Sequence, residues 1–317
     1  MSVDLDDLLA KTSRTFALAI PMLPEPTRKA VGVAYLLFRI ADTFEDATDW
    51  PRSRRIEALL DFSALFGLPS DERRGRAEAL QGAWLAEPPV AHQGYLELLG
   101  KTSDVIAEGD AMAEGIRRIL AKHTVRTAEG MAKVVARADE RGNLRLTSVR
   151  DLQDYCYIVA GIVGELLTEV FVHDAPSLQR EASTLSKHMV AFGEGLQLVN
   201  ILKDAGVDER DGRVYLPVDT PRAHIFALAR RDLVEARDYV RALQRGGAPR
   251  GFLEFTGTSL VLANASLDRL EEQGPGAKVS RSDVARLVGA LQVELEGGAE
   301  LELLGRAGPP SPRPAPP

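Results

Sequence analysis

Apolar residues recur along this chain with the three-to-four-residue spacing of amphipathic helices, and the alternating pattern of a half-buried strand is nearly absent. Glycine and proline breakers divide the pattern into separate segments. The segments predict helices over residues 27–47, 54–65, 77–85, 94–121, 128–138, 149–172, 186–203, 221–244, 251–272 and 282–304. The pattern therefore predicts an all-α fold.

None of the internal breakers resembles an interdomain linker, so residues 1–307 are expected to form a single domain. Residues 308–317 are mostly proline. Such a composition lacks the apolar side chains that a core requires. We expect a disordered tail there.

One polar stripe interrupts the first long helix. From residue 30 to residue 41 almost every side chain is apolar, which predicts a helix buried on most sides. The polar exceptions are Tyr35, Arg39, Asp42 and Asp46, whose spacing places them on one helical face. Because buried charges must be paired or solvated, the stripe predicts a polar cavity. An internal salt bridge from Arg39 to one of the aspartates is the alternative.

A second helix repeats this layout. Gln197, Asn200, Asp204 and Asp208 share one face of an apolar segment. Both helices thus carry two aspartates four residues apart, whose carboxylates repel unless a cation lies between them. Magnesium bound to a phosphate would meet that need, so the two stripes together predict a pocket for diphosphate esters. Gly206 leaves open whether the second helix reaches Asp208, and a solvated helix end is the alternative.

Charge and composition narrow the classes of function. The net charge is −7 and the pI about 5.4, without the basic excess of nucleic-acid-binding proteins. A single cysteine, Cys156, excludes an internal disulfide and fits a reducing compartment. The acidic N-terminus lacks the apolar region of a signal peptide, and the apolar stretch 30–41 is too short to span a bilayer. We expect a cytoplasmic protein without a membrane anchor.

Five segments, in this order and spacing, resemble the motifs of a known family: residues 13–16, 35–46, 155–164, 197–208 and 213–217. The family is that of the squalene and phytoene synthases, the head-to-head branch of the isoprenoid synthase fold. The first acidic motif, Asp-Thr-Phe-Glu-Asp, is more similar to that of squalene synthases than to that of typical phytoene synthases. The resemblance implies an isoprenoid synthase-type helical bundle around a central cavity.

The resemblance also implies an activity, which is a magnesium-dependent prenyltransferase reaction. Two molecules of farnesyl diphosphate would be joined head to head through presqualene diphosphate, and reduction by NADPH would then give squalene. An enzyme that stops at presqualene diphosphate, or makes a phytoene- or dehydrosqualene-type carotenoid precursor, is the alternative. Prenyl chain length and oligomeric state stay open, and peripheral membrane contact is expected for product release.

Roles for individual residues follow from the same resemblance. It implies that the metal ligands are Asp42, Glu45, Asp46, Asp204 and Asp208. It implies that the substrate-binding residues are Ser13, Arg14, Phe16, Tyr35, Arg39, Gln197, Asn200, Lys203 and Arg213. Tyr155 would assist proton loss.

Two basic sites bear on the binding of phosphate and of the nicotinamide cofactor. Lys203 stands where squalene synthases usually carry arginine, and lysine binds phosphate as a point charge without a bidentate fork. The basic segment 278–281 resembles one near the end of family members that would contact the nicotinamide cofactor. A solvated surface loop is the alternative for that segment.

Small residues mark the third motif. Gly161 and Gly164 each cost a helix about 1 kcal/mol relative to alanine, so another factor must favour them. Either a neighbouring helix packs closely there, or space is left for an apolar ligand, and the resemblance implies room for the prenyl tails around Gly161.

Three alternative functions fit these residues less well. A head-to-tail chain extender would carry Asp-Asp-x-x-Asp motifs, but neither cluster begins with adjacent aspartates. A di-iron bundle would carry Glu-x-x-His pairs, and residues 169–173 have a different spacing. A non-catalytic helical scaffold is the non-enzyme alternative, and it leaves both acidic stripes unexplained.

Overall fold

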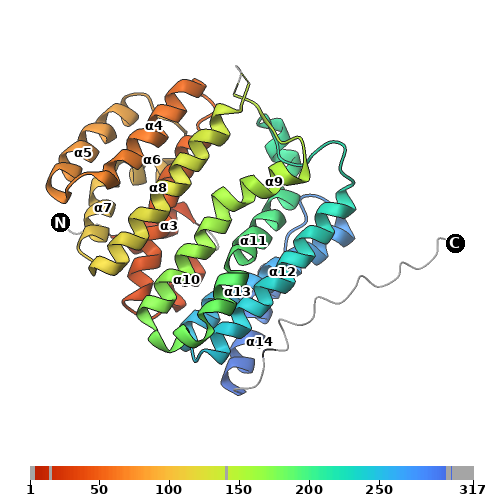
Figure 1. Cartoon of the computed structure of the whole chain (residues 1–317). Helices are drawn as coiled ribbons and strands as arrows, with labels where there is room; N and C mark the ends of the chain where they lie inside the picture. The colour runs from red at the N-terminus through yellow and green to blue at the C-terminus, as the bar shows by residue number, and fades with distance from the viewer. Residues whose placement is uncertain (1–3, 14–15, 140–141, 298–300, 302–317) are drawn as a thin grey trace.

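The computed structural model describes residues 4–13, 16–139, 142–297 and 301, and long helices account for most of them (Figure 1). The helices are α1 (Leu5–Thr12), α2 (Phe16–Ala19), α3 (Thr27–Glu45), α4 (Arg52–Ala64), α5 (Ser70–Ala86), α6 (Gln93–Gly100), α7 (Thr102–Asp110), α8 (Glu114–Ala136), α9 (Val149–Cys156), α10 (Ile162–Asp174), α11 (Ala182–Arg210), α12 (Arg222–Arg245), α13 (Arg250–Gln273) and α14 (Arg281–Gly297). Short 3-10 turns are η1 (Ile20–Met22), η2 (Leu65–Gly67) and η4 (Pro176–Glu181), and η3 (Tyr157–Gly161) is a π-helical turn between α9 and α10. The predicted all-α fold is confirmed.

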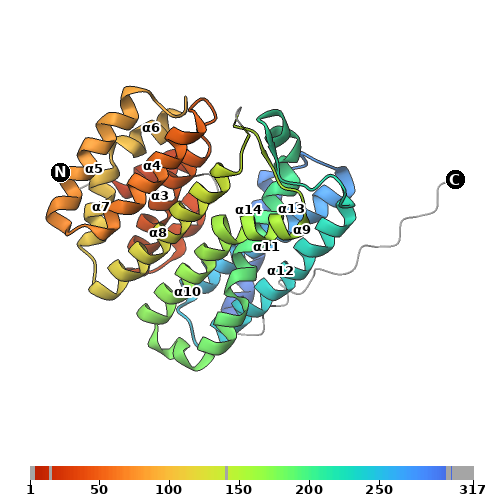
Figure 2. The same ribbon diagram turned by 45° about the horizontal axis from the view of Figure 1, so that its top comes forward.

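The helices form two groups that face each other (Figures 1 and 2). Helices α3 to α8 lie together in one group, and α11 to α14 lie in the other. Helix α10 packs against both α8 and α11 and so connects the groups. Both acidic motifs end up facing the space between these groups, because α3 contributes one and α11 the other.

The predicted helix over residues 94–121 is wrong. The structure breaks it into α6, α7 and the start of α8, and the helix predicted over 128–138 is the second half of α8. At the first break, the Gln81 side chain from α5 donates to the Gly100 carbonyl at 2.8 Å and accepts from the Ser103 amide at 2.6 Å. This tertiary contact satisfies backbone groups that a continuous helix would pair internally.

Helix α11 is longer than the sequence predicted. It continues through Gly206 to Arg210, so Asp204 and Asp208 both lie on regular helix. A glycine within a helix costs stability without ending it, and here the helix tolerates that cost.

Close helix packing explains the small residues of the third motif. A Cβ atom on Gly164 would lie 1.9 Å from the Met189 carbonyl oxygen, and one on Gly193 would lie 2.0 Å from the Ala160 carbonyl oxygen. The backbones of α10 and α11 therefore approach where any side chain would collide. Gly161 faces protein side chains, with a Cβ position 2.8 Å from the Tyr157 ring, so it opens no space for a ligand.

We expect Gly164→Ala to lower the free energy of unfolding by about 3 kcal/mol, because overpacking a rigid backbone contact forces the helices apart. Gly82→Ala in α5 is the matched control, since its Cβ would meet nothing within 4 Å and its helix should gain up to about 1 kcal/mol. Urea unfolding of the three proteins measures both effects. Equal stability of Gly164→Ala and the wild type would contradict the close approach.

Among the residues that the structure describes, one continuous helical segment, Val149–Asp174, is long and apolar enough by length and composition to cross a membrane, with a mean hydropathy of 1.6 in its most apolar window. In this protein 56% of that window is buried. Its π-helical turn and α10 pack against α8 and α11. A core helix has the same composition, and this segment occupies a core position.

Candidate active site

The first acidic stripe begins with a fixed cation. Arg39 lies 3.2 Å from the Asp42 carboxylate, so the internal salt bridge considered from the sequence is present. The Arg39 Nε donates to the Tyr35 hydroxyl at 3.3 Å, and that hydroxyl donates to the Thr12 carbonyl at 2.8 Å. The guanidinium also lies 5.5 Å from the Tyr35 ring and 5.4 Å from the Tyr95 ring. Burial opposes its charge, but Asp42 and the tyrosines raise the pKa of Arg39, so it stays cationic.

The second stripe lies on α11. Lys203 is 3.2 Å from the Asp204 carboxylate and donates to the Asn200 side-chain oxygen at 3.2 Å. Asp208 follows one turn later and is largely shielded from solvent. The lysine and the two carboxylates therefore meet at the same end of the helix.

Arg213 connects the two stripes. It forms an ion pair with Asp46 of the first stripe and lies 3.7 Å from Asp208 of the second. Two short parallel strands, β1 (Leu144–Arg145) and β2 (Arg213–Val214), hold it in place. The guanidinium thus balances carboxylates from elements that are far apart in the sequence.

Two adjoining cavities lie between the helix groups. The first, here called the acidic cavity, has a volume of about 410 Å³ and is lined by Arg39, Asp42, Glu45, Asp46, Tyr155, Val159, Gln197, Asn200, Ile201, Lys203, Asp204, Asp208, Arg213 and Tyr215. The second, here called the large cavity, has a volume of about 720 Å³. Arg39, Asn200 and Lys203 line both.

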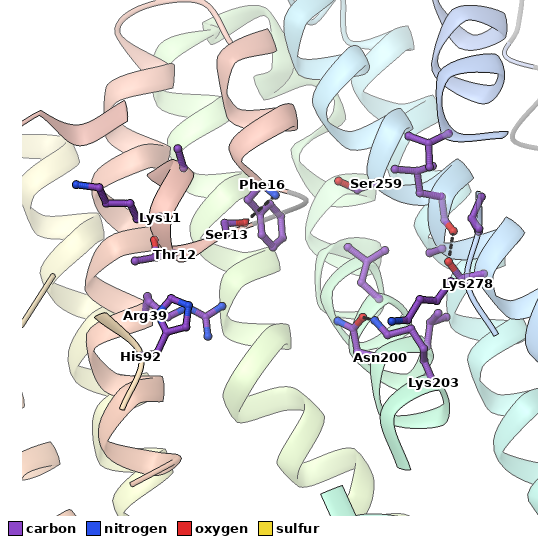
Figure 3. A pocket seen from close by; sticks show the side chains of 18 of the residues that line it. Lys11, Thr12, Ser13, Phe16, Arg39, His92, Asn200, Lys203, Ser259 and Lys278 are labelled. Carbon is purple, nitrogen blue, oxygen red and sulfur yellow. Dashed lines mark hydrogen bonds between the residues drawn. The ribbon is translucent and has the colours of Figure 1, made fainter. Parts of the chain in front are cut away.

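The large cavity has basic groups on two sides and a partly apolar lining. Figure 3 shows Lys11, Arg39 and His92 on one side and Lys203 and Lys278 on the other. Its apolar lining comes from Ala10, Phe16, Leu196, Val199, Leu262, Ala263, Val279 and Val284. The combination suits a molecule with an anionic group and an apolar chain.

A tyrosine pair forms part of the acidic cavity wall. The Tyr155 hydroxyl donates to the Tyr215 hydroxyl at 3.0 Å, and the two rings stack with centroids 4.6 Å apart. Burial raises the pKa of both phenols well above the usual value, and Glu45 raises both further. Both hydroxyls therefore remain protonated at neutral pH.

A family model described as "Squalene/phytoene synthase" matches residues 9–225, which is more than half of the chain and includes both acidic motifs. The chain belongs to the squalene/phytoene synthase family. The matched range contains both stripes, Arg213 and the tyrosine pair.

Individual relatives agree with this family. The chain is 30% identical over 213 residues to the squalene synthase of Schizosaccharomyces pombe, covering 66% of this chain and 43% of the relative. It is 29% identical over 240 residues to phytoene synthase 3 (chloroplastic) of Zea mays, covering 75% of this chain and 47% of the relative. The chain thus spans less than half the length of these curated relatives.

Solved structures support the same fold. A complex of TcSQS with the ligand E5700 superposes with a TM-score of 0.71 at 22% identity, covering 97% of this chain and 92% of that one. A dehydrosqualene synthase in complex with a ligand gives a TM-score of 0.54 at 17% identity, covering 92% and 95%. The helical bundle expected from the family resemblance is confirmed.

The structure brings together most of the site residues predicted from the sequence. All five predicted metal ligands, Tyr155 and the predicted binding residues of α11 line the acidic cavity. Ser13 and Phe16 line the large cavity instead. Tyr35 lines neither cavity and serves as a partner of Arg39. Arg14 and the tail at 308–317 lie outside the described residues, and the single domain over 1–307 stays a prediction.

Sequence reasoning missed Tyr215, Tyr95 and His92. Tyr215 stands two residues after Arg213, within a segment whose resemblance to the family was noted. Its period-two spacing from Arg213 along an extended strand could have identified it. Tyr95 and His92 lie in a loop and short helix with no motif, so the sequence offers no comparable signal for them.

The carboxyl groups of the acidic cavity are held at an electrostatic cost. Burial raises the pKa of Asp42 to about 6 and that of Asp208 to about 6. In each case a neighbouring aspartate raises it further, while the adjacent arginine opposes the rise. Burial also raises the pKa of Glu45 well above its usual value. A bound cation would relieve this cost, because it favours the ionised forms.

The acidic residues that line the acidic cavity offer carboxylate oxygens, which are hard ligands, and no described His or Cys residue lines it. Within the described ranges, no three His, Cys, Asp or Glu side chains form a ready-made metal site. Magnesium commonly takes one or two carboxylates and completes its shell with water and substrate phosphates. These residues therefore fit magnesium held jointly with a diphosphate, with Asp42, Glu45 and Asp46 on one side and Asp204 and Asp208 on the other.

The raised pKa values predict how the metal-free protein responds to pH. The pKa of each of these carboxyls is higher in the folded protein than in the unfolded chain. Ionisation therefore costs more in the folded state, and the free energy of unfolding falls as pH rises toward about 6. We therefore expect the wild type to lose stability, relative to the double variant Asp42→Asn/Asp208→Asn, between about pH 4 and pH 7. Urea unfolding in the presence of a chelator measures this difference. If the difference in unfolding free energy between the two proteins does not change with pH, the raised pKa values of Asp42 and Asp208 are contradicted.

Proposed function

We propose that this chain is a magnesium-dependent prenyltransferase that joins two molecules of farnesyl diphosphate head to head through presqualene diphosphate. We further propose that reduction by NADPH completes the reaction to squalene. The observation that carries this proposal is the convergence of two acidic stripes and three cations, Arg39, Lys203 and Arg213, on one cavity. Family membership supports the head-to-head class of reaction.

In this proposal the acidic cavity binds the diphosphate and magnesium, and the large cavity binds the prenyl chain. Arg39, Lys203 and Arg213 would bind diphosphate oxygens, and the carboxylates would hold magnesium, which supplies charge neutralisation for the leaving diphosphate. Phe16 and the apolar wall of the large cavity would exclude water from the reactive allylic carbon. The Tyr155 hydroxyl would orient the released diphosphate as it accepts a proton.

The large cavity also has groups suited to a dinucleotide. Lys203 and Lys278 face it from one side (Figure 3). Lys278, which lines the large cavity only, would bind a phosphate of NADPH as a point charge, whereas Lys203 also lines the acidic cavity and would bind the substrate diphosphate. Lys278 thus supports the reductive half of the proposal. We also propose a cytoplasmic location and peripheral membrane contact for product release.

A carotenoid-type product is the second candidate, and a specific observation favours it. The maize phytoene synthase matches this chain at nearly the same identity as the squalene synthase of Schizosaccharomyces pombe, and over a larger share of it. The lysine at position 203 also departs from the usual squalene synthase residue. A phytoene- or dehydrosqualene-type product, or release of presqualene diphosphate itself, would fit the same cavity. A helical scaffold would leave the buried charges without a role.

Product analysis decides among these candidates. The purified protein is incubated with farnesyl diphosphate and magnesium, with and without NADPH. Squalene that forms only with NADPH supports the full proposal, whereas presqualene diphosphate or dehydrosqualene in both samples supports the second candidate. If neither forms, geranylgeranyl diphosphate is tested next. The absence of any head-to-head product from both substrates would overturn the proposal.

A further inference from the structure

Arg55 lies beneath the first acidic motif, outside both cavities. It belongs to α4, and its side chain is buried, with the residue only 3% exposed. One guanidinium nitrogen donates to the Glu45 carbonyl oxygen, and its Nε donates to the Phe44 carbonyl oxygen at 3.4 Å. These are carbonyls of the last turn of α3, which lack partners within the helix. Arg55 therefore caps the C-terminal end of α3, which lies within the acidic motif.

In the part of the chain that the structure describes, the charge of Arg55 has no dedicated partner. Among the described residues, no carboxylate forms an ion pair with it, and its Nη1 is buried without a hydrogen-bond partner. Burying an unpaired guanidinium is costly. The carboxylates that act on it electrostatically are Glu45 and Asp46, and the carboxyl end of α3 adds a partial negative charge. Its compensating charge is thus the acidic motif itself.

This arrangement differs from that of the other arginines near the motif. Arg39 and Arg213 line the acidic cavity and would contact a ligand. Arg55 lines neither cavity and reaches the motif through main-chain oxygens. A neighbour on the same helix, Arg54, points elsewhere: it pairs with Glu87 and lies 4.1 Å from the Trp50 ring.

We propose that Arg55 is a positioning residue for cation binding. Through its bonds to the Phe44 and Glu45 carbonyls it fixes the last turn of α3, so that the Glu45 and Asp46 carboxylates face the acidic cavity before a cation binds. This inference rests on the proposed function, since it takes the acidic cavity to be the magnesium–diphosphate site. A purely structural cap would lower stability alone, whereas a positioning residue also weakens metal binding in the folded protein.

Calorimetric titration of magnesium with inorganic pyrophosphate separates these two roles. It is run well below the unfolding temperature of every variant. We expect Arg55→Met to bind about 10-fold more weakly than the wild type, because outer residues that orient metal ligands typically carry at least that factor. Arg55→Lys keeps the charge but loses the fork, and we expect an intermediate affinity. The matched control, Arg54→Met, should bind like the wild type.

The outcomes are distinguishable. If the wild type binds and Arg55→Met binds equally well, the inference is overturned and the proposed function stands. If the wild type does not bind magnesium with pyrophosphate, the proposed function fails and the inference fails with it. Should Arg55→Met not fold, Arg55→Lys carries the test, and wild-type affinity in that variant would overturn the inference.

Discussion

Asp46→Asn and Asp204→Asn are each expected to remove nearly all turnover of farnesyl diphosphate while leaving the fold intact. One residue belongs to each acidic stripe, and both line the acidic cavity. Asparagine keeps the shape of the side chain but loses the charge that a magnesium ion requires. Neutralisation of a leaving group by a metal is worth several kcal/mol, so we expect a loss of about 1,000-fold.

The measurement is pyrophosphate release at saturating magnesium, with circular dichroism and thermal unfolding as checks on the fold. Asp49→Asn and Glu209→Gln are matched controls, because both side chains are exposed, lie within five residues of a stripe and line neither cavity. They should keep near-native rates. A near-native rate in Asp46→Asn or Asp204→Asn would remove that residue from the metal assignment.

The two stripes could be predicted because helical periodicity alone decides which side chains share a face. An apolar background leaves Asp42 on α3 and Asp46 at the C-cap of that helix as exceptions, and the same reasoning identifies Asp204 and Asp208 on α11. Periodicity does not specify how deep a side chain lies, so it could not show that Tyr35 contacts Arg39 and lines neither cavity. Family resemblance then supplied the chemistry that periodicity could not.

The remaining features depend on contacts between distant residues. The ion pair of Arg213 with Asp46 joins positions 167 residues apart, and it requires a two-residue strand pair that no alternating pattern announces. The break between α6 and α7 is stabilised by Gln81, a side chain from another helix. Such features arise from packing, so local sequence carries little trace of them.

Tyr155→Phe is expected to slow formation of the cyclopropyl intermediate about 100-fold, the scale for loss of one oriented hydrogen-bond donor to a reacting oxygen. The hydroxyl lines the acidic cavity and is held by Tyr215 at 3.0 Å. Because burial keeps this hydroxyl protonated, we expect it to orient the diphosphate that accepts the proton and not to act as the base itself. Single-turnover measurement of presqualene diphosphate formation tests this effect.

Two further tyrosine variants determine whether the hydroxyl or the packing matters. Tyr215→Phe keeps the Tyr155 hydroxyl but removes its acceptor, so we expect a smaller loss of about 10-fold, on the scale of one hydrogen bond. Tyr157→Phe should have no effect on this step, because its hydroxyl bonds to Glu165 and lines neither cavity. Magnesium and pyrophosphate should still bind Tyr155→Phe. An unchanged single-turnover rate in Tyr155→Phe would contradict the role, whereas lost pyrophosphate binding would assign this hydroxyl to substrate capture, since orientation of a bound diphosphate requires that it first be bound.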